Sequence, residues 1–440
     1  MRTYADLHIH SRYARACSPQ LTPENIDLWC RIKGIGLVAT GDFTHPKWFA
    51  ELTEKLESYG EGLYRLKPEF RRREPRFSPV SEVDVRFICG TEVACIYKHG
   101  VAVRRVHHCI FAPTLEVVAK INASLEQRGC NLKADGRPIL GLTSIDLLKI
   151  ILEIDPRNVL IPAHAWTPWF AIFGSKSGYD SIVECFEDLA PYIFSIETGL
   201  SSDPLMNWRV SALDKVALTS HSDAHSLPNL GREADIFEGG ELSYNAVMKA
   251  IREAGPAAAE ALKQTATLKL AGTVEFFPDE GRYHFDGHRD CKVRFSPLES
   301  AKHKGICPVC QRELTIGVLN RVEELADRPA GFRPADALPF TSLVELDKVI
   351  AQAQGVKGRA TKAVEQQYWQ LVSEGRGELP LLLDAPLERL VGLTTERVVE
   401  GIRRLRAAEI AEIVPGYDGE YGTVHLFRAD ERTTAQTSLF

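Results

Sequence analysis

Two short motifs carry side chains whose types and spacing suit a metal site. Residues 6–10 read DLHIH and residues 221–225 read HSDAH. Side chains of a β-strand alternate between its two faces, so the first, third and fifth residues of each motif would project together. Imidazole and carboxylate groups in such a set suit zinc, manganese or iron. We therefore predict a metal site whose first ligand candidates are Asp6, His8, His10, Asp223 and His225.

The elements that must position these ligands alternate between strand and helix through the first 275 residues. Short apolar runs at 36–40, 85–89 and 158–162 alternate with helix-like stretches, among them 22–33 and 144–152. This pattern predicts an α/β fold, a parallel sheet covered by helices, in which a barrel would gather ligands at the carboxyl ends of its strands. Together with the first set, the candidates at such ends outnumber the ligands of one metal and predict a cluster of two or three: Asp42, His45, Glu92, His107 and His164.

The order of these ligands resembles the polymerase-and-histidinol-phosphatase (PHP) family of phosphoesterases. The likeness consists of HxH near the start, a downstream glutamate, two later histidines and a final DxH. It implies a PHP-type distorted (β/α)7 barrel with two or three divalent ions, which could be Zn, Mn, Mg or Fe. It also implies the ligand sets, which are His8, His10, Glu92 and Asp223 for one metal, a bridging Glu92 with His107 and His164 for the second, and His225 for a third.

Two details of this resemblance concern single positions. His107 is preferred to His108, because it has the family's spacing before residues 111–113. After the second strand the family usually has adjacent Asp-His, whereas this chain has Asp42-Phe43-Thr44-His45. That departure leaves the third metal open.

Longer motifs narrow the resemblance to the endonuclease Q family, PHP enzymes of deaminated-DNA repair. The resemblance implies a metal-dependent DNA endonuclease that cuts 5′ of hypoxanthine, uracil, xanthine or an abasic site. The chemistry agrees, because a multinuclear site can lower the pKa of bound water toward ~7 and stabilise the leaving oxygen of an in-line displacement. We expect Asp223, Glu92 and Lys176 to be catalytic. The motifs cover nearly the whole chain and lie at 41–48, 162–180, 195–210, 220–234, 283–291, 307–329 and 414–422.

Aromatic rings are concentrated in the loop that follows His164. Enzymes that act around a damaged nucleotide extrude it and stack it against such rings. We hypothesise that the loop holds the flipped lesion, although any one ring could equally belong to the barrel core. Lys176, next to Ser and Gly, is a candidate phosphate clamp. The predicted base pocket consists of Trp166, Trp169, Phe170, Phe173, Ser175, Lys176 and Tyr179.

A different metal-ligand spacing follows the barrel. His288-x2-Cys291 and Cys307-x2-Cys310 are separated by fifteen residues, which fits a tetrahedral structural zinc with no position left for water. So short a segment has little core of its own, so metal binding would supply its stability. We predict one structural zinc in a module over 276–332, with His284 as the rival of His288. Its lysines and arginines make it our leading candidate for gripping the duplex beside the lesion.

The remainder of the chain predicts a small, mostly helical domain over 333–434. A capping box at 342–345 would open a helix that ends near Gly355, and a second helix would cover 395–408. The arginines of the second helix would usually be solvated. A basic segment at 65–76 could contact the DNA backbone or be solvated.

The last residues, 435–440, resemble the Q-x-[SD]-L-F peptide that docks on the bacterial sliding clamp. A free tail could insert its two terminal apolar side chains into a hydrophobic groove of a partner. Gln436, Leu439 and Phe440 would make the contacts. The predicted partners are therefore damaged DNA and the clamp.

Composition limits the remaining possibilities. The chain has 440 residues, 44% of them hydrophobic, and a net charge of −6, so it has no global basic field that would indicate nucleic acid. It shows neither a secretory leader nor a run of about 18 apolar residues, and its ten cysteines suit a reducing compartment. We expect a cytoplasmic protein of two or three domains that does not bind membranes.

Three other functions share some of these features. A strand-end proofreading exonuclease would differ in needing a free DNA end. A small-molecule phosphomonoesterase would share the barrel but would have no need of a zinc knuckle or a clamp-like tail. A non-catalytic binding module would be expected to have lost ligands.

Overall fold

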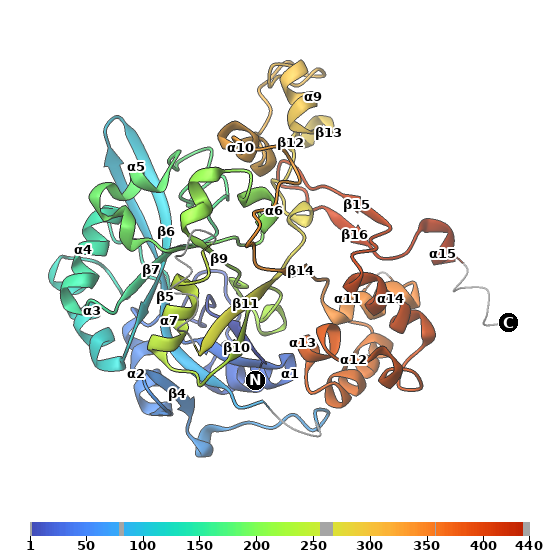
Figure 1. Cartoon of the computed structure of the whole chain (residues 1–440), viewed down its shortest axis with the longest axis horizontal. Helices are drawn as coiled ribbons and strands as arrows, with labels where there is room; N and C mark the ends of the chain where they lie inside the picture. Colours follow the sequence, from blue (N-terminus) through green and yellow to red (C-terminus); the bar gives the residue numbers. More distant parts are fainter. Residues whose placement is uncertain (1, 79–82, 256–266, 357, 434–440) are drawn as a thin grey trace.

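The computed structural model describes residues 2–78, 83–255, 267–356 and 358–433 (Figure 1). Within these residues, one sheet of ten strands runs in the order β14-β11-β10-β1-β2-β5-β4-β3, with β6 on β5 and β7 on β6. The strands are β1 (Arg2–Asp6), β2 (Ile35–Ala39), β3 (Leu56–Ser58), β4 (Leu63–Leu66), β5 (Arg86–His99), β6 (Ala102–Ala112), β7 (Val159–Pro162), β10 (Ala234–Gly239), β11 (Leu268–Glu275) and β14 (Phe340–Ser342).

The sheet is mixed, so the prediction of a parallel sheet is wrong in part. β1–β2 and β2–β5 are parallel, but β1–β10, β10–β11, β5–β6 and β6–β7 are antiparallel. The reason is clearest at β5 and β6, because only Gly100 and Val101 separate them and so short a turn can join only antiparallel strands. The α/β class is confirmed, and the distorted (β/α)7 barrel stays a prediction.

The strands and helices predicted in the first half of the chain are confirmed. β2 is buried at every position, as expected of a central strand covered on both faces. α1 (Pro23–Lys33) begins after Thr22, whose side chain accepts a hydrogen bond from the amide of Asn25, and ends at Gly34 with φ 79°. The other helices of this part are α2 (Pro46–Lys55), α3 (Leu115–Gln127), α4 (Ser144–Ile154), α5 (Ile182–Phe186), α6 (Pro204–Asn207) and α7 (Tyr244–Arg252), and a separate parallel pair is β8 (Ser195–Glu197) and β9 (Ala217–Thr219).

The second half holds two smaller groups of elements (Figure 1). The segment predicted to bind zinc contains β12 (Asp286–His288), β13 (Val293–Phe295), α9 (Pro297–Lys302) and α10 (Val318–Leu325). The C-terminal group contains α11 (Leu346–Gln354), α12 (Lys362–Glu374), α13 (Glu378–Leu383), α14 (Glu396–Arg406), β15 (Glu412–Val414), β16 (Thr423–His425) and α15 (Ala429–Thr433).

The predicted capping box at 342–345 is wrong. Ser342 ends β14 instead, where it pairs with Glu275 of β11. α11 begins after Glu345, whose carboxylate makes no cap and instead approaches the Lys348 ammonium at 2.9 Å. The predicted end of this helix at Gly355 is confirmed, as is a helix within 395–408, which is α14.

The C-terminal helices pack against α1 through a buried ion pair. Lys33 Nζ lies 2.6 Å from Glu378 Oε2, and the hydroxyl of Tyr368 donates to the same oxygen at 2.7 Å. Because removal of one partner would leave an uncompensated buried charge, this contact holds the two parts in one arrangement. None of the helices in the described ranges is long and apolar enough to cross a membrane.

Candidate metal centre

The first cluster of potential ligands joins three separate strands. His8 and His10 follow β1, Glu92 lies within β5 and Asp223 follows β9, and one ligand atom of each lies within 4.8 Å of the others. His10 Nε2 is 3.0 Å from Asp223 Oδ1 and 3.2 Å from Glu92 Oε2. His8 Nε2 is 3.5 Å from Glu92 Oε2. Two imidazoles and two carboxylates thus face one point.

Outer carboxylates orient both imidazoles. His8 Nδ1 lies 3.0 Å from each oxygen of Glu197, and His10 Nδ1 lies 2.9 Å from Asp42 Oδ1. A carboxylate on one ring nitrogen leaves the other free to bind a metal, which is the usual arrangement around metal-bound histidine. His8 Nε2 is buried and has no hydrogen-bond partner among the described residues. A buried polar atom without a partner is costly, and a metal ion would remove that cost.

The second cluster shares Glu92 with the first. Glu92 Oε1 lies 2.7 Å from His107 Nδ1 and 3.0 Å from His164 Nε2, while Oε2 faces the first cluster. His108 points elsewhere, with Nε2 2.8 Å from the hydroxyl of Ser144. Two oxygens of one carboxylate therefore face two separate groups of donors, and both groups have the chemistry to hold divalent ions.

The charges of the centre keep its carboxylates ionised. Burial opposes ionisation of Glu92, but the imidazoles that face its carboxylate and the guanidinium of Arg137 hold its pKa well below its usual range. Burial likewise opposes ionisation of Glu197, and the neighbouring His8 and His221 lower its pKa to about 2. Burial lowers the pKa of His107 to about 4 despite the adjacent Glu92. Burial also opposes protonation of His8, His10 and His164, but the acidic groups around them raise the pKa of each ring. Metal ligands must be deprotonated, so the ionised carboxylates and the neutral His107 are ready to bind a metal, which would displace the protons of the other three rings.

Three residues of the centre adopt the left-handed backbone conformation that non-glycine residues rarely take. The φ angles are 41° at Asp42, 30° at His164 and 46° at Asp223, each shortly after a strand ends. Gly199 supports one of these turns, since a Cβ added there would lie 2.6 Å from the Cβ of His164. Such backbone strain clusters at functional sites, and here it turns side chains toward the centre.

Four predicted ligands, which are Asp6, Asp42, His45 and His225, lie outside both clusters. Asp6 accepts hydrogen bonds from the amides of Ser222 and Gly231 at 3.1 and 2.9 Å, so it braces the loop that carries Asp223. The ring of His45 stacks on Tyr13 with 4.4 Å between centroids. His225 Nδ1 lies 2.8 Å from the carbonyl oxygen of Asp223. Asp42 acts through His10, as described above.

Sequence reasoning missed Glu197 and Arg137. Glu197 ends β8, so its place at a strand end was a signal that could have found it. Arg137 lies in the connection between α3 and α4, where nothing in the sequence marks it. Its Nη1 donates to Glu92 Oε2 at 3.0 Å.

The aromatic loop divides into a buried part and an accessible part. Trp166, Phe173 and Tyr179 are buried, and the Trp166 indole donates to Asn207 Oδ1 at 2.8 Å. Phe170 packs against His107 with ring centroids 4.7 Å apart, while Trp169 is partly exposed. The three buried rings are core, and the accessible part consists of Trp169, Phe170, Ser175 and Lys176.

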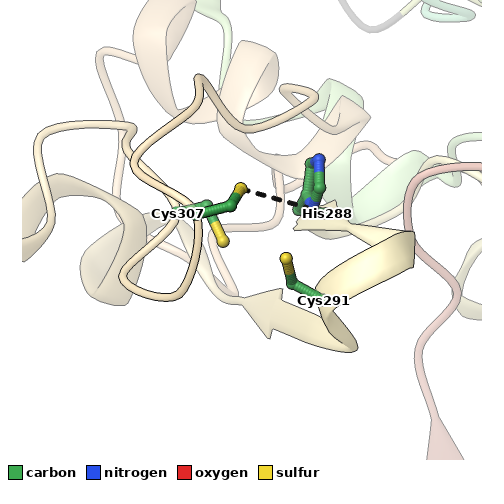
Figure 2. A group of neighbouring side chains, drawn as sticks. His288, Cys291 and Cys307 are labelled. Atoms are coloured by element: carbon green, nitrogen blue, oxygen red, sulfur yellow. Dashed lines mark hydrogen bonds between the residues drawn. The ribbon is translucent and has the colours of Figure 1, made fainter.

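His288, Cys291, Cys307 and Cys310 form a third group, whose ligand atoms also lie within 4.8 Å of one another. Figure 2 shows His288, Cys291 and Cys307 directed toward one another. The rival His284 is not part of this group, and its Nε2 lies 3.5 Å from Asp279. Three thiols and one imidazole in this arrangement suit tetrahedral zinc.

The other basic segments are largely occupied by protein partners. In the segment 65–76, Arg65 pairs with Glu57 at 2.7 Å and Arg76 pairs with Glu74 at 2.8 Å. On α14, Arg403 and Arg404 both pair with Glu400, and each pairs with a second carboxylate, so their charges are already matched. The predicted clamp tail lies outside the described residues.

Comparison with solved structures shows what this arrangement is similar to. The lesion-specific endonuclease PfuEndoQ of Pyrococcus furiosus superposes with a TM-score of 0.81 and 28% identity, over 99% of both chains. A complex of endonuclease Q with a 27-mer duplex bearing an abasic lesion at the active site gives a TM-score of 0.81 and 29% identity, over all of both chains. This chain is similar to endonuclease Q over its whole length.

Sequence comparisons are less informative than the endonuclease Q structures. The uncharacterised protein MJ0043 of Methanocaldococcus jannaschii is 30% identical over 271 residues, which is 59% of this chain and 31% of that protein. The chain thus spans about a third of the length of that relative. No protein-family model matches.

Proposed function

We propose that this chain is a metal-dependent DNA endonuclease that hydrolyses the phosphodiester 5′ of a deaminated base or an abasic site. The observation that carries the proposal is Glu92, whose two oxygens face two donor groups in a chain similar throughout to endonuclease Q. Cytoplasmic DNA carrying hypoxanthine, uracil, xanthine or an abasic site would be the substrate. Amide and nucleoside substrates have no corresponding support.

We assign the metal ligands from the two clusters. His8, His10, Glu92 and Asp223 would hold one ion, and Glu92, His107 and His164 a second, with His225 as a ligand of any third. When bound, two such ions supply a hydroxide nucleophile at neutral pH and stabilise the leaving oxygen. Glu197 and Asp42 would keep the imidazoles of His8 and His10 in their orientation.

Arg137 is our candidate for binding the scissile phosphate. Hydrogen bonds anchor its loop, from the Arg137 amide to Asp135 Oδ1 at 3.1 Å and from the Gly136 amide to the Tyr13 carbonyl at 3.0 Å. The guanidinium has five N–H donors, of which the contact with Glu92 uses one. A fixed guanidinium with donors to spare beside the cluster suits a phosphate oxygen better than the flexible, exposed Lys176 does.

The lesion and the duplex would contact neighbouring parts of the chain. The accessible aromatic residues Trp169 and Phe170 would stack against the extruded base, with Lys176 nearby as a second phosphate contact. The Cys3His group would hold a structural zinc in a module over 276–332 that grips the duplex. We also retain the helical domain over 333–434 and a clamp-binding tail as proposals.

Incision of a linear duplex with one abasic site tests the proposal. We expect single-turnover cleavage that a chelator abolishes and added Mn²⁺, Mg²⁺ or Zn²⁺ restores. Glu92→Gln should slow cleavage at least ~1000-fold, because the bridging charge contributes to both metal sites, whereas Glu57→Gln, on β3 at the end of the sheet, should cleave normally. Equal cleavage of an undamaged duplex, or no cleavage with any metal, would contradict the proposal.

A further inference from the structure

The β5–β6 hairpin extends past the strands beside it toward the edge of the molecule (Figure 1). Val101, in its turn, is fully exposed, and Val103 is about half exposed. Lys98 and Arg105 are also exposed. Exposed valines next to basic residues form a surface that the protein core does not require.

The charge of this hairpin is unusual for the chain. Residues 93–115 contain no Asp or Glu, although the whole chain has 59 acidic residues and a net charge of −6. Lys98 and Arg105 have no carboxylate partner among the described residues, in contrast to Arg65, Arg76 and Arg403. Unpaired cations on an acid-free surface complement a polyanion.

The hairpin leads directly into the metal centre. Val103, Arg105 and His107 lie on one face of β6, because alternate residues of a strand share a face and the β5–β6 register is unbroken. Lys98 lies opposite Val103 on β5. The guanidinium of Arg105 lies 6.0 Å from the centroid of Phe170, whose ring in turn packs on His107. The surface is therefore continuous from the exposed turn to the second cluster.

From these observations we infer that the hairpin face, defined as Lys98, Val101, Val103 and Arg105, binds duplex DNA that flanks the cleaved phosphate. Lys98 and Arg105 contact backbone phosphates, and the two valines lie against the sugars or the groove. His107 lies six positions along the chain from Val101 in the turn, a length of ~20 Å at about 3.3 Å per residue. That length corresponds to about six base pairs at ~3.4 Å per pair. This inference rests on the proposed function.

The test varies the charge of the hairpin and the length of the duplex. The full chain and its Lys98→Glu/Arg105→Glu variant bind abasic duplexes that carry either twelve or three base pairs on each side of the lesion. Fluorescence anisotropy measures Kd at several salt concentrations. Lys120→Glu/Lys149→Glu, exposed positions on α3 and α4, is the control with the same charge change. Thermal melting verifies that each variant folds.

We expect the hairpin variant to bind the long duplex about 10-fold or more weakly, with a salt slope lower by about two, one for each lost phosphate contact. Binding of the short duplex should weaken less, because three base pairs reach Arg105, two residues from His107, but not Lys98. Its rate of cleavage at saturation should match that of the parent chain. Unchanged binding of the long duplex, or an equal loss of binding with the control variant, would overturn the inference. It would also be overturned if the hairpin variant bound DNA normally and lost only the ability of the chain to self-associate. If the parent chain itself cleaves neither duplex, the proposed function fails instead.

Discussion

Arg137 carries the proposed contact with the scissile phosphate, and Arg137→Lys tests that contact. Lysine keeps the charge but loses the planar fork of donors, so we expect the single-turnover rate to fall about 10- to 100-fold, roughly 1–3 kcal/mol of transition-state stabilisation. The bound metal, measured by elemental analysis, should not change. Arg12→Lys, whose guanidinium binds Glu51, is the matched control. An unchanged rate in Arg137→Lys would show that Arg137 takes no part in the reaction. A loss of bound metal would show that Arg137 positions Glu92 instead of binding the phosphate.

Single residues of the centre differ in how far the sequence predicts them. Glu92 and the histidines around it follow from the order of the motifs, although Glu92 lies within β5 and His107 within β6 rather than at the predicted strand ends. Residue type and spacing also predict Asp6 and His45 as ligands, whereas Asp6 braces a loop and His45 stacks on Tyr13. Arg137 could not be predicted, since its contact with Glu92 depends on how an irregular loop folds over β5.

At the scale of elements, sequence periodicity predicted individual helices and strands but did not predict how distant strands pair. The sequence identified the helices α1, α4 and α14 by their N-caps and apolar patterns. It identified the central strands by their apolar runs. The antiparallel pairing of β10 with β1 could not be predicted, since the paired residues lie more than 200 positions apart in the sequence. The capping box at Ser342 failed for a similar reason, because β11 recruits that residue into the sheet.

Glu275 of β11 provides a pH test of this packing. Burial raises the pKa of Glu275 to about 8, above its usual value near 4.5, and Thr198 and Thr273 donate to its oxygens. Between pH 4.5 and 8 the folded state keeps a proton that the unfolded state releases, so this group lowers stability as pH rises through that window. Below about 4.5 both states are protonated, and it costs nothing.

Glu275→Gln should therefore gain stability relative to the parent chain as pH rises from 5 to 8, by up to a few kcal/mol. Urea unfolding at a series of pH values measures the difference. Glu238→Gln, at a partly exposed position of the neighbouring β10, should show no such trend. A parallel pH dependence in the parent and Glu275→Gln would contradict the assignment.

At the scale of the whole molecule, the separate parts are joined by contacts that no local pattern contains. Arg321 of α10 donates to the carbonyl oxygens of Phe173 and Tyr179 at 3.0 and 3.2 Å, which ties the aromatic loop to the segment proposed to bind zinc. Lys33 and Glu378 do the same for α1 and the C-terminal helices. The sequence predicted the parts and their order, but only the structure shows these contacts between them.

Loss of the proposed zinc ligand Cys291 should therefore affect more than its own segment. We expect Cys291→Ser to lose one zinc per chain and to melt at a lower temperature, because metal binding supplies roughly 10 kcal/mol to such small folds. Hydrogen exchange should also increase in the aromatic loop. His303→Gln, exposed in the same segment, should keep its zinc. Full zinc content in Cys291→Ser would contradict the Cys3His assignment.

The most direct test of the central claim uses a covalently closed circular duplex that carries one hypoxanthine, beside its undamaged twin. A circle has no free end and no phosphomonoester, so neither an exonuclease nor a phosphomonoesterase can act on it. With Mn²⁺ or Mg²⁺ we predict a single nick 5′ of hypoxanthine and an intact twin. Equal nicking of both circles, or an intact lesion circle with every divalent metal, would contradict the account.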